Sequence, residues 1–273
     1  RDPLVGDGRS WAVITGATDG IGLSYARQLA HKRYNLLLIS RSADKLEKVR
    51  NDLQVIQQPL NTTTKVLDID FTINTDEVYD RIGREVRVLD DIHVLINNVG
   101  MGYPDGLPVY FVEQPDVEAF SRDMINANIV SCTRLTAQIL PAMVRRGRGV
   151  VVNVSSFASN LPIPLIGVYS ATKAYMDYFS RALEAECRHT GVIVQSLIPN
   201  VVLTKMNANI REQPSMKRLY PTADEYVKQA IRTVGRQSRA PGCRSHCIMQ
   251  CCFGFLRFIC DIIGVELDLM IIQ

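Results

Sequence analysis

The sequence has little excess charge of either sign. Its 31 Lys and Arg residues nearly balance its 28 Asp and Glu residues, so the formal net charge is only +3. Proteins that bind nucleic acid neutralise many phosphates with a surplus of basic side chains. The composition therefore argues against nucleic acid as a partner.

The chain also lacks a long uninterrupted apolar run. The segment 247–272 is strongly apolar, but polar residues such as Arg257 and Asp261 interrupt it before it reaches the roughly 18 apolar residues of a membrane-spanning helix. A segment of this kind could still lie on a membrane surface. The first apolar run, Trp11 to Ile14, looks like a strand and not like a signal peptide, so no targeting segment is visible. Because the chain opens with Arg1 and not Met, we expect that the natural N-terminus is missing.

The cysteines are not paired as they are in disulfide or zinc frameworks. Cys132 and Cys187 stand alone inside helix-like stretches, which argues for reduced thiols. Cys243, His246 and the cysteines at 247, 251 and 252 lack the Cys-x-x-Cys arms of a structural zinc site. We therefore predict no metal, an apolar helix with buried free thiols, and a His246 that is packed or faces the substrate.

Short apolar runs alternate with longer segments of helical period. Val150-Val151-Val152 is typical of a strand that is buried on both faces. The alternation predicts an α/β fold, a single Rossmann-like doubly wound parallel sheet with helices on both faces. At 273 residues we expect one domain, 1–273, with an apolar C-terminal segment, 243–273. We interpret the basic cluster at 145–148 as a solvated turn. The predicted strands are 11–15, 35–40, 65–68, 94–97, 150–155 and 193–198.

A glycine-rich turn, Thr15 to Gly22, follows the first strand directly and precedes a helix-like stretch. Glycines let the backbone approach a pyrophosphate, whose charge then faces the helix N-terminus. Such turns also occur for packing alone, but the strand and helix on either side favour a cofactor site. The residues predicted to contact the cofactor are Gly16, Thr18, Asp19, Gly20, Ile21 and Gly22.

The end of the second strand predicts the form of the cofactor. Ser40 and Arg41 stand where a carboxylate would select NAD. A guanidinium can pair with the extra phosphate of NADP through two hydrogen bonds, so NADP(H) is favoured, although Arg41 could also be an ordinary surface residue. Asp70 after the third strand is a candidate to meet the adenine amino group, and Asn98 after the fourth is a candidate to line the adenosine pocket, although either alone could be part of an ordinary loop.

Tyr169 and Lys173 are four residues apart, so they share one face of a helix. A nearby cation lowers the pKa of a phenol toward the working range of an acid or base. Such a pair is frequent by chance, but Ser156 lies thirteen residues upstream at the tip of a predicted strand, where its hydroxyl could polarise a substrate oxygen.

These motifs together resemble the short-chain dehydrogenase/reductase family over residues 10–205, which we take as the cofactor-binding and catalytic core. The resemblance implies that Tyr169 is the acid/base and that Lys173 also binds the nicotinamide ribose. It further implies that Ser156 orients the carbonyl and that an asparagine supports a proton relay. Asn128 matches this asparagine, with Asn126 as the alternative.

Finer features, such as Ala223 to Lys228, are similar to the branch of 17β-hydroxysteroid dehydrogenases type 3 and type 12, the latter also being very-long-chain 3-oxoacyl-CoA reductases. The branch implies an NADPH-dependent ketone reductase at the cytosolic side of the endoplasmic reticulum membrane, acting on a steroid or fatty acyl-CoA. Those relatives have an N-terminal membrane helix, and the type 12 proteins end in a dilysine signal. Either this chain is trimmed or its localisation differs.

The stretch after the sixth strand differs from most of the family, which has Pro-Gly where Pro199-Asn200 stands here. Asparagine tolerates left-handed backbone, so we expect the turn to survive. Thr204 is a candidate cofactor contact by analogy, or a helix N-cap. Residues 201–220 suit either a substrate lid or a solvated amphipathic helix.

The working hypothesis is reduction of a ketone by NADPH with Tyr169 as general acid. One alternative is a catalytically silent NADP(H)-binding protein with a regulatory or scaffolding role, but such family members usually lose the tyrosine or the lysine. Another is oxidation of an alcohol with NAD, which Arg41 disfavours. A homo-oligomer is a family expectation.

Overall fold

A computed structural model describes residues 2–103, 109–207 and 220–263. Its centre is a parallel sheet of seven strands in the order β3-β2-β1-β4-β5-β6-β7. The strands are β1 (Trp11–Thr15), β2 (Asn35–Ser40), β3 (Thr64–Asp68), β4 (Ile92–Asn97), β5 (Gly149–Val154), β6 (Val192–Leu197) and β7 (Arg239–Ala240). The predicted parallel sheet is therefore confirmed, with strand bounds within two residues of those expected. Only the two-residue β7 was not foreseen.

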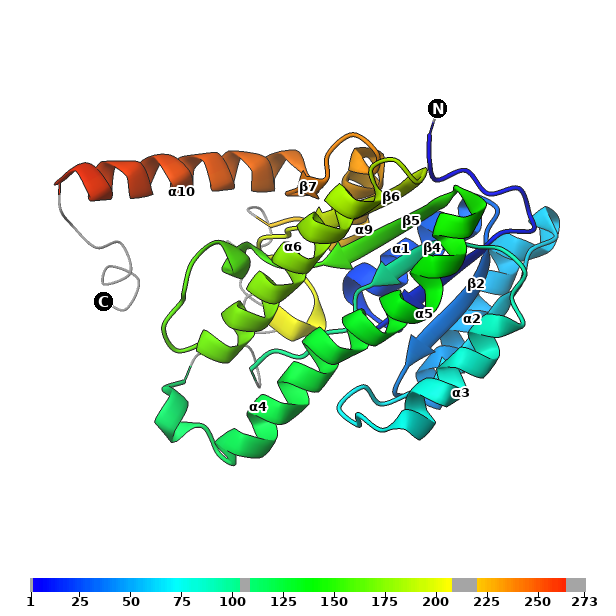
Figure 1. The fold of residues 1–273 in the computed structure, drawn as a ribbon, viewed down its shortest axis with the longest axis horizontal. Helices are drawn as coiled ribbons and strands as arrows, with labels where there is room; N and C mark the ends of the chain where they lie inside the picture. The colour runs from blue at the N-terminus through cyan, green and yellow to red at the C-terminus, as the bar shows by residue number, and fades with distance from the viewer. Residues whose placement is uncertain (1, 104–108, 208–219, 264–273) are drawn as a thin grey trace.

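Helices cover both faces of the sheet (Figure 1). One face carries α1 (Gly20–His31), α2 (Ala43–Gln57) and α9 (Ala223–Ala230). The other carries α3 (Asp76–Arg87), α5 (Ser131–Arg146) and α6 (Gly167–Cys187). Side chains alternate along a strand, so in β1 Ala12 and Ile14 join the first apolar cluster and Val13 joins the second. The core is thus two apolar layers, one on each side of the sheet.

The remaining elements are short or lie at the margins of the sheet. A helix α4 (Val117–Ile125) runs through a π-helical segment η4 (Asn126–Val130) into α5. The 3-10 segments are η1 (Gln58–Leu60), η3 (Phe111–Glu113), η5 (Phe157–Asn160), η6 (Lys205–Asn207) and η7 (Ile231–Thr233). The C-terminal helix α10 (Arg244–Ile263) extends away from the body (Figure 1). Within the described residues, no helix is long and apolar enough to cross a membrane.

The strand order of the sheet reverses beside β1. The chain runs from β1 outward through β2 to β3, then returns to add β4 on the other side of β1. Ligands of open α/β sheets bind at the carboxyl ends of the strands where the order reverses in this way. The glycine turn after β1 and the loop after β4 meet at this position.

The basic turn between α5 and β5 is only partly as expected. Its residues are exposed, and Gly147 ends α5 in the left-handed region at φ 66°. However, Arg146 and Arg148 are not free in solvent, because both pair with Asp91, at 3.1 and 3.4 Å. Asp91 lies just before β4, so the turn ties two neighbouring strands together at their amino ends.

Candidate active site

The glycine turn is tightly packed at the start of α1. Gly16 has a φ of 62°, in the region that favours glycine. A Cβ on Gly22 would lie 2.4 Å from the Gly16 carbonyl oxygen and 2.5 Å from Asn98 Nδ2. No side chain therefore fits at Gly22, and the close-packed turn forms a cradle at the start of a helix, whose N–H groups and positive dipole end attract an anion. This cradle fits the pyrophosphate of a dinucleotide.

The loop after β4 is fixed to the glycine turn by hydrogen bonds. The N–H groups of Asn98 and Val99 donate to Thr15 Oγ1 at 3.0 and 2.9 Å. The Asn98 amide donates to the carbonyls of Thr15 and Gly16 at 3.0 and 3.2 Å. Asn98 therefore shapes the cradle through its side chain. The central role of Thr15 in this junction was missed from the sequence, although Thr15 stands inside the turn motif.

The ends of β2 and β3 lie beside this cradle. Thr18 Oγ1 is 3.1 Å from Ser40 Oγ, which joins the turn to the end of β2. Arg41 is exposed, and no carboxylate of the described residues lies within ion-pair distance of it. Asp70 Oδ1 accepts from the N–H and the hydroxyl of Thr72, at 3.0 and 2.8 Å. Arg41 is thus available to an anionic ligand, while one carboxylate oxygen of Asp70 is engaged in its own turn.

Tyr169, Lys173 and Ser156 meet where β5 ends and α6 begins. Lys173 is 4% exposed, and its Nζ donates to the Val154 carbonyl at 2.9 Å and lies 5.7 Å from the centre of the Tyr169 ring. Ser156 hydrogen-bonds to Tyr169, and its Oγ also accepts from the Ala158 N–H at 3.2 Å. The three side chains thus form one cluster, as their spacing predicted.

The pKa of Tyr169 shifts in the direction opposite to the one expected from the sequence. Burial raises the pKa of Tyr169, and the hydrogen bond with Ser156 lowers it only in part. The expected net lowering of this pKa is therefore not found, because burial of the phenol is the largest effect on it. Burial lowers the pKa of Lys173 itself to about 8. The phenol is therefore held in its protonated form.

The structure distinguishes between the two candidate asparagines. Asn128 is fully buried in η4, where its Nδ2 donates to the Met101 carbonyl at 3.0 Å and its Oδ1 accepts from the Met101 N–H at 2.6 Å. Asn126 instead donates to the Thr72 carbonyl at 2.8 Å. A Cβ placed on Gly100 would lie 3.4 Å from both Asn128 Oδ1 and Lys173 Nζ. Asn128, not Asn126, therefore belongs to the cluster.

The π-helical turn that carries Asn128 was not foreseen. Such turns are frequent at functional sites, and no periodicity in the sequence announces this one. A bond from Asn128 Nδ2 to Thr172 Oγ1 at 2.9 Å then links η4 to α6. Thr172, like Thr15, is a supporting residue that the sequence did not single out.

The stretch after β6 reaches back to the glycine turn. A Cβ on Gly20 would lie 2.9 Å from Thr204 Cγ2, and Lys205 Nζ lies 2.8 Å from Asp19 Oδ2. Asp19 also caps α1 by accepting from the Gly20 N–H at 2.7 Å. The Asp19 carboxylate is therefore occupied by protein groups. Most of the expected lid, 208–219, lies outside the described residues.

The turn at Pro199-Asn200 survives for a reason other than the one expected. Asn200 does not adopt a positive φ, so tolerance of left-handed backbone is not what preserves the turn. Instead, the Asn200 N–H donates to His246 Nδ1 at 3.1 Å. His246 is therefore packed, as one of the two expectations had it. No group of residues suited to a metal ion occurs within the described parts of the chain.

The expectation of buried thiols in the C-terminal helix is largely wrong. Cys243 is buried, but the thiols at 247, 251 and 252 are exposed. The physical reason is that α10 extends away from the body, so the sheet and its helices do not cover these residues (Figure 1). The segment 264–273 lies outside the described residues.

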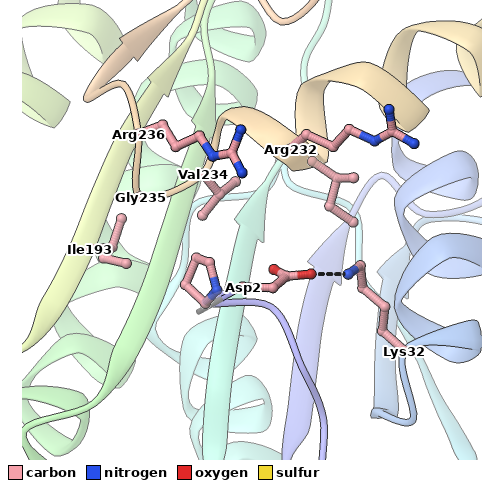
Figure 2. Close-up of a pocket in the computed structure, with 9 residues that line it drawn as sticks. Asp2, Lys32, Ile193, Arg232, Val234, Gly235 and Arg236 are labelled. Atoms are coloured by element: carbon pink, nitrogen blue, oxygen red, sulfur yellow. Dashed lines mark hydrogen bonds and ion pairs between the residues drawn. The ribbon is translucent and has the colours of Figure 1, made fainter.

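A pocket of about 250 Å³ lies far from this cluster, at the amino ends of the strands (Figure 2). It is lined by Ile193 at the start of β6, by Arg232 and Arg236 near η7, and by the ion pair of Asp2 and Lys32. The candidate catalytic residues are at the opposite ends of the strands. This pocket is therefore separate from the candidate active site.

Comparison with known sequences gives a consistent picture. Residues 10–215 match the family of short chain dehydrogenases. The chain is 45% identical over 239 residues to the very-long-chain 3-oxoacyl-CoA reductase of Rattus norvegicus, and the match covers 88% of this chain and 73% of that protein. The protein of the same name from Homo sapiens is 43% identical over the same lengths.

Solved structures show the same architecture. A short-chain dehydrogenase from Sphingobium yanoikuyae in complex with NADPH has a TM-score of 0.75 and 25% identity, and the match covers 92% of this chain and 95% of that one. A protein studied for 7beta-hydroxysteroid dehydrogenase stereoselectivity has a TM-score of 0.76 at 22% identity, covering 86% and 88%. The second likeness concerns the fold alone.

Proposed function

The chain belongs to the short-chain dehydrogenase family, in the branch of the very-long-chain 3-oxoacyl-CoA reductases, and on this premise we propose that it reduces the ketone of a 3-oxoacyl-CoA. It is an NADP-dependent oxidoreductase acting on CH-OH or C=O groups, with NADP(H) as its cofactor. The substrate and the roles of individual residues are the content of the proposal.

One observation supports the proposal most directly. Tyr169, Ser156, Lys173 and Asn128 gather at the carboxyl ends of β4 and β5, next to the cradle at Gly22. A ketone lying there would have a hydroxyl donor, a protonated phenol and a cofactor site beside it. Reduction of a carbonyl requires a hydride and a proton, and a hydroxyl donor stabilises the charge that develops on the oxygen.

In this mechanism the bound NADPH supplies the hydride. The Ser156 hydroxyl donates a hydrogen bond to the ketone oxygen and stabilises the charge that develops on it. Tyr169 donates its proton to the same oxygen, and the raised pKa of its phenol keeps that proton available beforehand. Donors that are already oriented need no reorganisation during the reaction.

Lys173 and Asn128 have supporting roles in the proposal. Lys173 binds the nicotinamide ribose through its ammonium, which the Val154 carbonyl holds in place. Met101 and Thr172 use both amide N–H groups of Asn128, so its Oδ1 would order the water that returns a proton toward the phenol. Protons would reach Tyr169 by this route after each turnover.

A 3-oxoacyl-CoA is preferred over a 17-ketosteroid because the relatives that are 41–45% identical carry the name 3-oxoacyl-CoA reductase. The test is NADPH consumption by the purified protein with a long-chain 3-oxoacyl-CoA and with a 17-ketosteroid. Turnover of the acyl-CoA is expected. Turnover of the steroid alone would reject the proposed substrate, and tight NADPH binding with no turnover of any ketone would favour the silent binding protein.

We also propose that Arg41 selects NADPH over NADH. Arg41 is exposed at the end of β2, and pairing with the adenosine phosphate is expected to contribute about 1.5–3 kcal/mol. Arg41→Ala should weaken NADPH binding by about tenfold or more and leave NADH binding nearly unchanged. Equal losses for both cofactors in a fluorescence titration would remove Arg41 from this role.

The cellular location and the oligomeric state of the protein are further parts of the proposal. We place it at the cytosolic side of the endoplasmic reticulum membrane, as the resemblance implies. Association with a membrane surface and with a second copy stay predictions. Fractionation of tagged protein and light scattering of the purified chain would test them.

A further inference from the structure

His246, in the first turn of α10, is a buried histidine that the proposed chemistry does not use. It is 0% exposed, and both of its ring nitrogens have backbone partners. Nδ1 accepts from the Asn200 N–H at 3.1 Å, and Nε2 lies 3.1 Å from the Val201 carbonyl oxygen. A backbone N–H can only donate and a carbonyl can only accept. The ring is therefore neutral, with its proton on Nε2.

The start of α10 holds the same stretch of backbone at a further point. Gln250 Nε2, one helical turn beyond His246, donates to the Ile198 carbonyl at 3.0 Å. The imidazole also packs against Tyr226 of α9, with ring centres 5.2 Å apart. Residues 198–201, which follow β6 directly, are thus bonded to α10 at three backbone positions.

This backbone leads directly to the glycine turn. Three residues after Val201, the Thr204 methyl group packs on Gly20, and Lys205 pairs with Asp19 at 2.8 Å. Lys205 is itself 66% exposed at its side chain, so the ion pair alone is a weak restraint. The placement of Thr204 and Lys205 therefore depends on the backbone bonds that precede them. These are the bonds where the chain leaves β6, and the bond from the Leu203 N–H to the Pro221 carbonyl at 3.0 Å.

We propose that His246 is a positioning residue for cofactor binding. Through its two backbone bonds it fixes the turn at Asn200 and Val201, and thereby holds Thr204 and Lys205 against the glycine turn. The inference rests on the proposed function, because it takes the glycine turn as the pyrophosphate site of NADPH. Helix α10 contributes no catalytic group, and on this proposal it supports the cofactor site through His246.

Two variants of His246 separate positioning from packing. His246→Leu removes both backbone bonds, whereas His246→Gln offers an amide oxygen to the Asn200 N–H and an amide N–H to the Val201 carbonyl. Tyr226→Phe is the matched control, because it removes the buried bond from the Tyr226 hydroxyl to the Pro241 carbonyl (3.0 Å) and leaves both imidazole bonds. The readouts are the NADPH Kd by fluorescence, kcat at saturating NADPH, and amide exchange over 200–205 without cofactor.

His246→Leu should raise the NADPH Kd by about tenfold and speed amide exchange at Asn200, with kcat changed less than about threefold. His246→Gln should restore most of the affinity, and Tyr226→Phe should lower Tm with the Kd unchanged. An unchanged Kd in His246→Leu, or an equal rise in Tyr226→Phe, would overturn the inference.

A third variant and the binding of NADPH by the wild-type protein complete the test. Where His246→Leu does not fold, Gln250→Leu removes the bond to Ile198 and should raise the Kd by a smaller factor. An unchanged Kd in that variant would also count against the inference. Failure of the wild-type protein to bind NADPH would reject the proposed function instead. In that case, unchanged amide exchange at Asn200 in His246→Leu would separately reject the claim that His246 fixes the turn at Asn200 and Val201.

Discussion

The carboxyl ends and the amino ends of the strands, called here the carboxyl edge and the amino edge of the sheet, are held together in different ways. At the carboxyl edge, buried neutral groups bond to one another, as in Asn97 Nδ2 to Asn153 Oδ1 at 2.8 Å and Asn153 Nδ2 to Ser180 Oγ at 2.9 Å. At the amino edge, partly exposed ions pair, as at Asp91 with Arg146 and at Asp2 with Lys32 (Figure 2), alongside the buried bond between the Tyr34 hydroxyl and His93 Nδ1 at 2.8 Å.

The two kinds of bond differ in how precisely they fix the groups that they join. Burying amides, hydroxyls and an ammonium is costly unless every partner is in place, so such a network fixes each atom that it includes. Exposed ion pairs contribute little and fix little. The buried network at the carboxyl edge includes the candidate catalytic residues, whereas the ion pairs at the amino edge join neighbouring strands.

The largest effect should come from the phenol at the carboxyl edge. Tyr169→Phe removes the proton donor and should lower kcat by about 10²- to 10⁴-fold with NADPH affinity nearly unchanged. Tyr178→Phe on the same helix, whose side chain is 71% exposed, should leave kcat unaltered. Steady-state kinetics of both variants makes the comparison, and full turnover by Tyr169→Phe would remove the carboxyl edge from the chemistry.

The buried ammonium predicts a pH dependence of stability. The pKa of Lys173 is about 8 in the folded protein against an ordinary value of 10.5 for the unfolded chain. Between these values the unfolded chain binds more protons, so stability rises with pH. The full gain is on the order of 3 kcal/mol. Lys173→Met should lack it, and denaturant unfolding of both proteins between pH 7 and 9 measures the part of it that falls in this range.

That measurement has to be a difference between two proteins. The buried thiol of Cys132 has its pKa raised to about 12, so its contribution to stability falls as pH rises above about 9. Because the Lys173 charge lowers the pKa of this thiol, its contribution differs between the two proteins above about pH 9, so the comparison is made between pH 7 and 9. Parallel pH profiles for the wild type and Lys173→Met would contradict the burial of a titrating ammonium.

A smaller effect is expected at the cradle. Gly22→Ala forces a Cβ against the Gly16 carbonyl and Asn98, which should cost about 1–3 kcal/mol and weaken NADPH binding. Gly167→Ala is the control, because a Cβ there meets nothing within 4 Å. Calorimetric titration with NADPH compares the two, and equal affinity would mean that the cradle does not contact the cofactor.

The smallest effect should be at the amino edge. Asp91→Asn removes the charge that pairs with Arg146 and Arg148, and it should lower the free energy of unfolding by about 1 kcal/mol or less with kcat unchanged. Denaturant unfolding and steady-state kinetics check both parts. A loss of activity would show that the two edges are coupled.

The sequence predicted those features that have a local pattern. The buried strands are continuous apolar runs, and Gly22, Tyr169 and Lys173 stand in recognisable spacings, so the sheet and the site cluster could be expected. The parallel order and the helices on both faces followed from the alternation of strand and helix.

Features that depend on distant contacts could not be predicted. The hydrogen bond from the Asn200 N–H to His246 joins residues that are 46 positions apart, and no spacing rule connects them. The direction of the Tyr169 pKa shift depends on how deeply α6 packs, which the spacing to Lys173 does not determine. The exposure of the thiols on α10 depends on where the helix leaves the body.

The most direct test of the central claim follows the hydride itself. The protein would be incubated with NADPH carrying deuterium on the nicotinamide ring and with a long-chain 3-oxoacyl-CoA, and the product would be analysed by mass spectrometry. We predict a 3-hydroxyacyl-CoA with deuterium at the former ketone carbon, formed by the wild type and nearly absent with Tyr169→Phe. Unreduced substrate despite bound NADPH, or equal product from both proteins, would contradict the account.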